Sequence, residues 1–218
     1  GDVVVLNDPF AGGTHLPDIT LVTAVHHEAA VHAYLAARAH HADVGGTTPG
    51  SIPLAREIYQ EGLRIPPVRL VRGGERVADV WRLVLANVRT PEERRGDLEA
   101  QLGALHAGAV RLHDIIARHG AAEVQQAMSV LLAYADRLVR AGIERIPDGA
   151  YAAEDVIEDD GFGNGPLPIR VRIEIEGAAM RVDFSGSAPQ TAGGVNAVEA
   201  ITVAATRYVV RCVAEESA

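Results

Sequence analysis

The sequence predicts an α+β fold in which a mixed or antiparallel sheet carries an inserted antiparallel helical hairpin. Three observations support this class. The apolar run at residues 3–6, the β-branched run at 19–25 and the segment at 30–39 predict strands near the start of the chain. Apolar residues at steps of three or four predict two long helices in the middle. Alternation of apolar and charged residues over 168–175 predicts a strand with one buried face and one wet face.

The first three strands are separated by residues that break extended structure. The run at 3–6 is apolar throughout and predicts a buried strand, which Asn7-Asp8-Pro9 ends. His26-His27-Glu28 is a plausible hairpin turn between the next two strands. Residues 54–90 then alternate short apolar and polar stretches and include Ile65-Pro66-Pro67-Val68, which must be extended or turned.

The helical pattern covers residues 91–120 and 122–141. Pro91 lies near its start, and Gly120 ends the first helix. Because the connection is so short, we expect an antiparallel hairpin whose helices bury four leucines between them: Leu98, Leu105, Leu131 and Leu138. Asp97 and Gln101 are the helix residues that we expect to face the candidate site.

Strand character returns at 168–184, where Gly177 marks a turn between two strands, and residues 196–214 predict a last helix. We therefore expect three regions. They are a β-rich region at 1–90, the helical hairpin at 91–146, and a truncated β-hairpin plus helix at 147–218. The chain opens on Gly1-Asp2 and enters a strand at once, so we expect a fragment of a larger multi-domain subunit.

The charge balance excludes several partners and chemistries. The formal net charge is −9, which disfavours nucleic acid and anionic membrane surfaces. All 20 basic residues are arginine. This segment therefore cannot form a lysine Schiff base or contain a P-loop, whose lysine reaches the nucleotide phosphates. If ATP is used, another chain or region must bind it.

One cysteine, Cys212, rules out a disulfide within the chain and favours a reducing, cytoplasmic location. Its apolar neighbours predict a small buried side chain rather than a nucleophile. No charged-then-apolar leader opens the chain, and its apolar runs are too short to cross a bilayer.

Histidine and carboxylate groups gather beside two strand ends. His15 and Asp18 come just before the strand at 19–25, and His40-His41 with Asp43 follow the strand at 30–39. If these strands form a hairpin, the two segments converge at one end of the sheet, and their loops lie side by side. Two imidazoles and a carboxylate suit Zn²⁺, Mn²⁺ or Fe²⁺ with positions left open for water or substrate.

Several longer motifs together resemble the central region of hydantoinase B and 5-oxoprolinase B-type subunits. The resemblance covers nearly the whole chain in the right order. It is carried by the run from Gly1-Asp2 through Asn7-Asp8-Pro9, and then by Gly12-Gly13-Thr14-His15-Leu16-Pro17-Asp18, Arg38-Ala39-His40-His41-Ala42-Asp43-Val44-Gly45-Gly46, Thr48-Pro49-Gly50-Ser51, Glu57-Ile58-Tyr59-Gln60-Glu61-Gly62-Leu63-Arg64-Ile65-Pro66-Pro67, Asn87-Val88-Arg89, Gly96-Asp97-Leu98 with Gln101, and Val182-Asp183-Phe184-Ser185-Gly186-Ser187.

The resemblance implies a division of labour in which an A-type partner binds ATP and phosphorylates the ring amide, and the B-type subunit completes ring opening. Related acetone carboxylases use a similar subunit with a Mn²⁺ site. Carried over to this chain, that site implies His15, Asp18 and one histidine of the His40-His41 pair as metal ligands. We favour His40, although His41 and Asp43 would share a face of an extended strand, which argues the other way. Family subunits are more than twice as long as this chain.

The remaining candidates are weaker. His41 and Asp43 are candidate catalytic residues beside the metal. Asp8 is a candidate base or outer carboxylate, or else the cap of the turn before Pro9. Arg64 could clamp a substrate carboxylate or form a structural salt bridge.

The sequence thus predicts a metal-dependent B-type subunit that opens hydantoins, 5-oxoproline or a related lactam with an A-type partner. One alternative is a carboxylase subunit of the acetone carboxylase kind. The other is a binding or scaffold subunit whose metal only holds the fold.

Overall fold

The computed structural model describes residues 1–51 and 53–216. The chain divides into two compact units, Gly1–Gln126 and Ala127–Ala218. Each unit has its own antiparallel sheet. The prediction of an α+β fold with antiparallel sheets is confirmed. The division into three regions stays a prediction.

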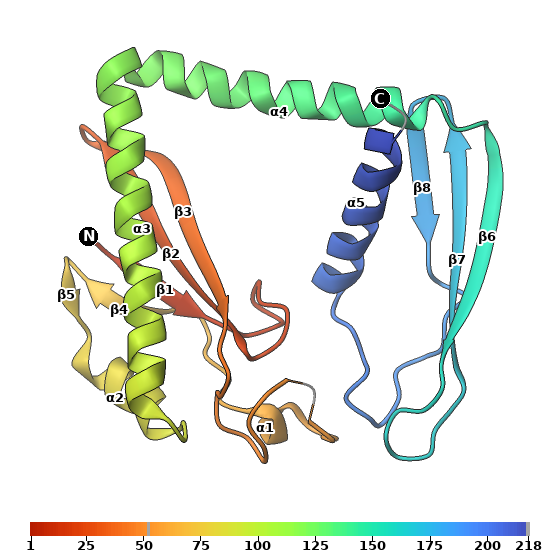
Figure 1. Cartoon of the computed structure of the whole chain (residues 1–218), viewed down its shortest axis with the longest axis horizontal. Helices are drawn as coiled ribbons and strands as arrows, with labels where there is room; N and C mark the ends of the chain where they lie inside the picture. Colours follow the sequence, from red (N-terminus) through yellow and green to blue (C-terminus); the bar gives the residue numbers. More distant parts are fainter. Residues whose placement is uncertain (52, 217–218) are drawn as a thin grey trace. The chain divides into compact units, whose positions relative to one another are not determined.

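The sheet of the first unit has five strands in the order β3-β2-β1-β4-β5 (Figure 1). Their bounds are β1 Val3–Leu6, β2 Asp18–His27, β3 Ala30–His40, β4 Val68–Arg72 and β5 Glu75–Arg76. Every neighbouring pair is antiparallel. The three strands predicted near the start of the chain are therefore present.

The β2–β3 hairpin is the longest pairing of this sheet, and it turns at Glu28, whose φ is 56°. Its register places Asp18 opposite His40. The backbone N–H of His41 donates to the Pro17 carbonyl at 2.8 Å, so the pairing continues one residue beyond β3. The predicted antiparallel pairing of these strands is confirmed.

The helices α2 Ala78–Ala86 and α3 Pro91–His119 pack on the sheet. The short helix α1 Ile58–Glu61 lies between β3 and β4 in the chain, and its Ile58 packs against the core. In Figure 1, α3 runs along β2 and β3, which it contacts, and α2 packs beside it. Leu98 and Leu105 of α3 join Leu21, Leu70 and Trp81 in the core between helix and sheet.

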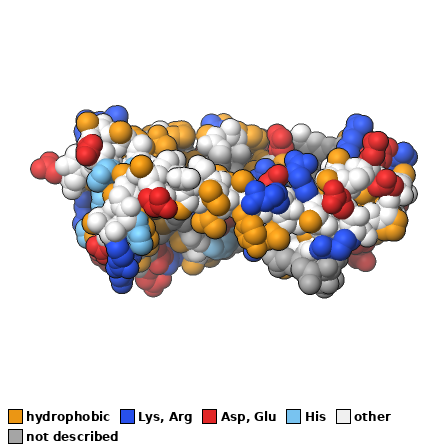
Figure 2. Space-filling view, turned by 90° about the horizontal axis from the view of Figure 1, so that it is seen from above, with side chains coloured by type: hydrophobic (Ala, Val, Ile, Leu, Met, Phe, Trp, Pro, Cys, Tyr) orange, Lys and Arg blue, Asp and Glu red, His pale blue; other side chains and the backbone are white. Residues whose placement is uncertain are grey.

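The helix α4 Ala121–Ile143 begins at the end of the first unit and continues in the second. The burial predicted for a helical hairpin is wrong, because Leu131 is 64% exposed and Leu138 is 51% exposed. Leu98 and Leu105 are buried against the sheet instead. Hydrophobic side chains lie among interspersed acidic and basic ones on the face seen in Figure 2.

The second unit contains the sheet β6-β7-β8, with β6 Gly149–Ile157, β7 Leu167–Glu176 and β8 Ala179–Asp183, and the helix α5 Glu199–Glu216. The predicted turn at Gly177 joins β7 to β8, and the predicted last helix is α5. Cys212 on α5 is exposed, so its predicted burial is wrong.

Candidate functional site

His15, Asp18 and His40 come together where β2 begins and β3 ends. The His15 Nδ1 atom lies 3.1 Å from the Asp18 Oδ2 atom, and the Thr14 hydroxyl donates to the same oxygen at 2.7 Å. The rings of His15 and His40 are 5.1 Å apart between centroids and tilted by 42°. The hairpin therefore places the two segments side by side, as the sequence predicted.

His40 and His41 point to opposite faces, because successive side chains of an extended strand alternate. His40 is exposed and lies against His15. His41 is 2% exposed, and its Nε2 atom is 2.9 Å from the Gln101 Oε1 atom on α3. Burial lowers the pKa of the His41 imidazole, although the hydrogen bond with Gln101 and the charge of Asp97 oppose that change. The structure thus brings His40, and not His41, to the His15 ring.

Asp43 is also engaged away from this cluster. Its Oδ1 atom accepts from the Arg89 Nη1 atom at 2.7 Å and from the Gly45 N–H at 3.0 Å, and its Oδ2 atom accepts from the Arg89 N–H. The carboxylate is buried. These contacts anchor the loop after β3 to the segment before α3, which is a structural role.

Asp8 and Arg64 lie beside each other on neighbouring segments. The Asp8 Oδ1 atom accepts from the Phe10 N–H at 3.0 Å, so this carboxylate caps the turn after β1. Its Oδ2 atom is 3.6 Å from the Arg64 Nε atom, and the guanidinium carbon of Arg64 is 6.0 Å from the centroid of the Tyr59 ring. Arg64 is partly exposed, so its guanidinium is accessible to a small anion.

Sequence reasoning missed Asn7, which holds the segments around the cluster together. Its amide nitrogen donates to the Leu16 carbonyl at 2.8 Å and to the Leu63 carbonyl at 2.9 Å. Its amide oxygen accepts from the Ile65 N–H at 2.6 Å. The side chain is fully buried. Its place directly after a buried strand is the signal in the sequence, where Asn7 is a strand break and part of a family motif but has no predicted bonding role.

Two glycines allow the loops to approach backbone to backbone. A Cβ atom on Gly13 would lie 2.5 Å from the Asn7 carbonyl oxygen, and one on Gly46 would lie 2.6 Å from the Glu61 carbonyl oxygen. Gly46 also has a φ of 80°, which side chains rarely adopt. These glycines therefore allow the loops to pack closely.

Glu61, at the end of α1, is a second residue that the sequence did not single out. Burial raises the pKa of its carboxyl, and the charge of His15 opposes this change. Glu61 is half-buried. A carboxyl group in this position adds to the electrostatic surroundings of His15.

The donor types in the cluster, imidazole nitrogen and carboxylate oxygen, are those that Zn²⁺, Mn²⁺ and Fe²⁺ accept. Within residues 1–51 and 53–216, however, no group of three or more histidine, cysteine or acidic side chains is arranged to hold an ion. In the structure, His15 Nδ1 faces Asp18 directly. An ion shared with His40 would require these side chains to rotate.

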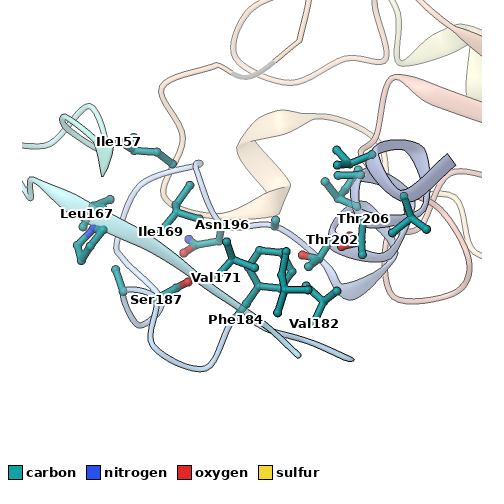
Figure 3. A pocket seen from close by; sticks show the side chains of 18 of the residues that line it. Ile157, Leu167, Ile169, Val171, Val182, Phe184, Ser187, Asn196, Thr202 and Thr206 are labelled. Atoms are coloured by element: carbon teal, nitrogen blue, oxygen red, sulfur yellow. Dashed lines mark hydrogen bonds between the residues drawn. The ribbon is translucent and has the colours of Figure 1, made fainter. Parts of the chain in front are cut away.

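The second unit contains an apolar cavity of about 920 Å³ between its sheet and α5. Figure 3 shows Val171, Val182 and Phe184 on the sheet side and Thr202 and Thr206 on α5. None of the residues that line it is charged or a histidine. The cavity therefore lacks the acid, base and metal-ligand groups that the first unit provides.

The whole chain, residues 1–218, matches the family described as Hydantoinase B/oxoprolinase, and the protein belongs to that family. Caprolactamase subunit beta of Pseudomonas jessenii is 39% identical over 183 residues, which are 84% of this chain and 32% of that protein. The chain spans about a third of the length of this relative and less than a fifth of the 5-oxoprolinases of Dictyostelium discoideum and Arabidopsis thaliana, which are 33% and 31% identical to it.

Two solved structures share the fold. The ATP-dependent caprolactamase from Pseudomonas jessenii superposes with a TM-score of 0.85 at 37% identity, over 90% of this chain and 34% of that one. A nucleotide-free acetone carboxylase has a TM-score of 0.80 at 17% identity, over 85% of this chain and 26% of that one. Among the described helices, none has the length and hydrophobicity needed to cross a membrane.

Proposed function

We propose that this chain is the site-bearing part of a B-type subunit of an ATP-dependent cyclic amidase, which opens the ring of a hydantoin, 5-oxoproline or a related lactam. The observation that carries the proposal is the His15–Asp18–His40 cluster at the end of the β2–β3 hairpin, in a chain of the hydantoinase B/oxoprolinase family.

In this proposal, His15, Asp18 and His40 hold one divalent ion, Zn²⁺, Mn²⁺ or Fe²⁺. When bound, such an ion polarises an amide oxygen and acidifies water. Arg64 binds an anionic group of the substrate, and Asp8 and Tyr59 orient its guanidinium. A base role for Asp8 stays a prediction beside its turn-capping role.

We assign supporting roles to His41 and Asp43 in place of the catalytic roles predicted from the sequence. His41 is buried against Gln101, and Asp43 is held by Arg89. Neither is free to meet a substrate in this arrangement. A cytoplasmic location stays a prediction from the single cysteine.

The rival functions have less support. The likeness to acetone carboxylase, at 17% identity, concerns the fold alone. A scaffold role with a structural metal calls for a closed set of four ligands, and the cluster offers two imidazoles and one carboxylate. We therefore propose ring opening rather than a carboxylase or scaffold function.

The metal assignment is tested by replacing His15 and His40 separately with alanine in the complete subunit. We expect each variant to lose its bound ion and at least about 100-fold in ATP-dependent ring opening, because ligand loss exceeds the cost of altering a ligand's support. Elemental analysis and turnover measure the two effects. His113→Ala, on the exposed face of α3, is the matched control and should keep both. Equal metal content in His15→Ala and the unchanged protein would refute the assignment.

The proposed function includes a partner requirement. This chain has no P-loop lysine, so ATP must be bound by another chain or another region, and the family resemblance assigns that role to an A-type subunit. We expect the B-type subunit alone to hydrolyse no hydantoin or lactam, and turnover to begin when the A-type subunit and ATP are added. Ring opening by the B-type subunit alone, without ATP, would contradict this dependence.

A further inference from the structure

Gln101 of α3 lies directly beneath the strand end that carries the cluster. Both polar atoms of its side-chain amide form hydrogen bonds there. Its Nε2 atom donates to the Ile19 carbonyl at 2.9 Å and to the Ala37 carbonyl at 3.1 Å. Its Oε1 atom is 2.9 Å from the His41 Nε2 atom. Gln101 is 5% exposed and His41 is 2% exposed. One side chain therefore ties the helix to both strands of the hairpin and to His41.

The same contacts define the orientation of both groups. The two carbonyl oxygens can only accept, so the amide nitrogen of Gln101 must face them and its oxygen must face His41. An amide oxygen cannot donate. The proton in this hydrogen bond therefore belongs to the His41 Nε2 atom, and the bond has a single direction.

The hydrogen bond between His41 and Gln101 also affects the direction of the His40 side chain, because the two histidines are neighbours on a strand. His40 and His41 are neighbours on an extended segment, so holding the His41 ring below the sheet sends the His40 side chain to the opposite face. There it meets His15. Strand ends fray when nothing holds them. The His41 N–H bond to Pro17 and the Gln101 bridge are two contacts that hold this one.

We propose that Gln101 and His41 are a positioning pair, which keeps His40 against His15 and Asp18 in the geometry that the site requires. The idea that these three residues bind an ion rests on the proposed function. The idea that the pair places the His40 ring beside His15 does not, and it can be tested separately.

The test uses four variants of the complete subunit: Gln101→Leu, His41→Leu, His41→Gln and Leu105→Ala. Gln101→Leu and His41→Leu remove the hydrogen bond between these two side chains. His41→Gln places a donor amide near the position of the His41 Nε2 atom. Leu105→Ala is the matched control, because Leu105 is buried one turn further along α3 in the same core and makes no polar contact with the hairpin. For each we would measure Tm, the nuclear Overhauser contact between the His15 and His40 rings, and the Kd for Zn²⁺ alone.

We expect Gln101→Leu and His41→Leu to lose the ring contact and to bind Zn²⁺ about 10- to 100-fold more weakly, the usual cost of removing support for a ligand. His41→Gln should restore most of the affinity. Leu105→Ala should lower Tm but leave the ring contact and the Kd unchanged. If Gln101→Leu does not fold, His41→Gln against His41→Leu provides the same comparison.

Two results overturn the positioning pair. One is an unchanged ring contact in both leucine variants. The other is an equal loss of ring contact in Leu105→Ala, which would make the effect one of general stability. If the unchanged protein binds no Zn²⁺, the proposed metal site fails, and the ring contact still decides whether the pair positions His40.

Discussion

Asn7 is the residue on which the geometry around the cluster depends most directly. It bonds the segment after β1 to the loop that carries His15 and to the segment that carries Arg64. Aspartate in its place would keep an acceptor for the Ile65 N–H but lose both donors. Alanine would remove the partner of the buried Leu16 carbonyl, of the buried Ile65 N–H and of the part-buried Leu63 carbonyl.

The expected effect of Asn7→Ala is a large loss of stability, because each buried polar group left unsatisfied costs about 1–3 kcal/mol. We expect the free energy of unfolding to fall by at least about 2 kcal/mol, measured by chemical denaturation. Asn87→Ala is the control, since its exposed amide donates only to the Leu83 carbonyl and should change stability by less than about 0.5 kcal/mol. A loss in Asn7→Ala no larger than that of the control would show that the bonds of Asn7 contribute little.

At this scale the sequence predicted the members of the cluster better than their orientations. The convergence of His15, Asp18 and His40 follows from the hairpin predicted for the strands at 19–25 and 30–39. The burial of His41 and the pairing of Asp43 with Arg89 depend on side chains 60 and 46 residues further along. A local sequence pattern does not identify partners that lie so far along the chain.

At the scale of elements, the strongest periodicities gave correct helices and strands, and the weak ones were missed. The β2–β3 hairpin follows from two strand segments around the turn at 26–28, and the β7–β8 hairpin follows from alternation and Gly177. The helix α3 follows from apolar spacing between Pro91 and Gly120. The strands β4 and β6 and the helix α2 were not predicted. β6 carries exposed residues over nearly its whole length, so it has no alternating apolar face to detect.

The apolar face of α4 shows a different limit. Its periodicity correctly predicted a helix, but periodicity does not identify the surface that a helix packs against. Leu131 and Leu138 remain exposed in the described structure, although their spacing is that of a buried face.

The connection from β6 to β7 is held by one buried carboxylate. Asp160 accepts from the Thr191 hydroxyl, the Asn164 side chain and the Gly193 N–H through Oδ2, and from the Phe162 and Asn164 N–H groups through Oδ1. The hydrogen bond from Thr191, followed by those from the other donors, holds the pKa of this carboxyl well below its usual value of 3.8. The loop at 158–166 is thereby fixed to the loop before α5.

This lowered pKa predicts an acid-sensitive second unit. Because the folded-state pKa lies below the unfolded value, the stabilisation is complete above the unfolded value and is lost as pH falls toward the folded one. Asp160→Asn should destabilise the second unit at neutral pH, and its difference from the unchanged protein should shrink between about pH 5 and pH 2. Hydrogen exchange in β6 and β7 measures this, with the exposed Asp155→Asn as control. A difference that is constant over this range would contradict the assignment.

At the scale of the whole molecule, the candidate site and its supports belong to one unit. The cluster, the positioning pair, Asn7 and the segment with Arg64 all lie within Gly1–Gln126. The same range contains every member of the large core between the five-stranded sheet and its helices. The second unit has its own sheet and its own cavity.

This distribution predicts that residues 1–126 fold without the rest of the chain. A compact unit with its own core should unfold in one cooperative transition. The fragment should also keep the contact between the His15 and His40 rings, because each residue that we have found to support that contact is present. Thermal unfolding and the ring contact by nuclear magnetic resonance measure the two properties, and the Leu98→Ala fragment is a control that should lower Tm by removing buried volume from the core. An intact ring contact in the complete chain but not in a folded fragment would mean that residues beyond 126 help to build the site.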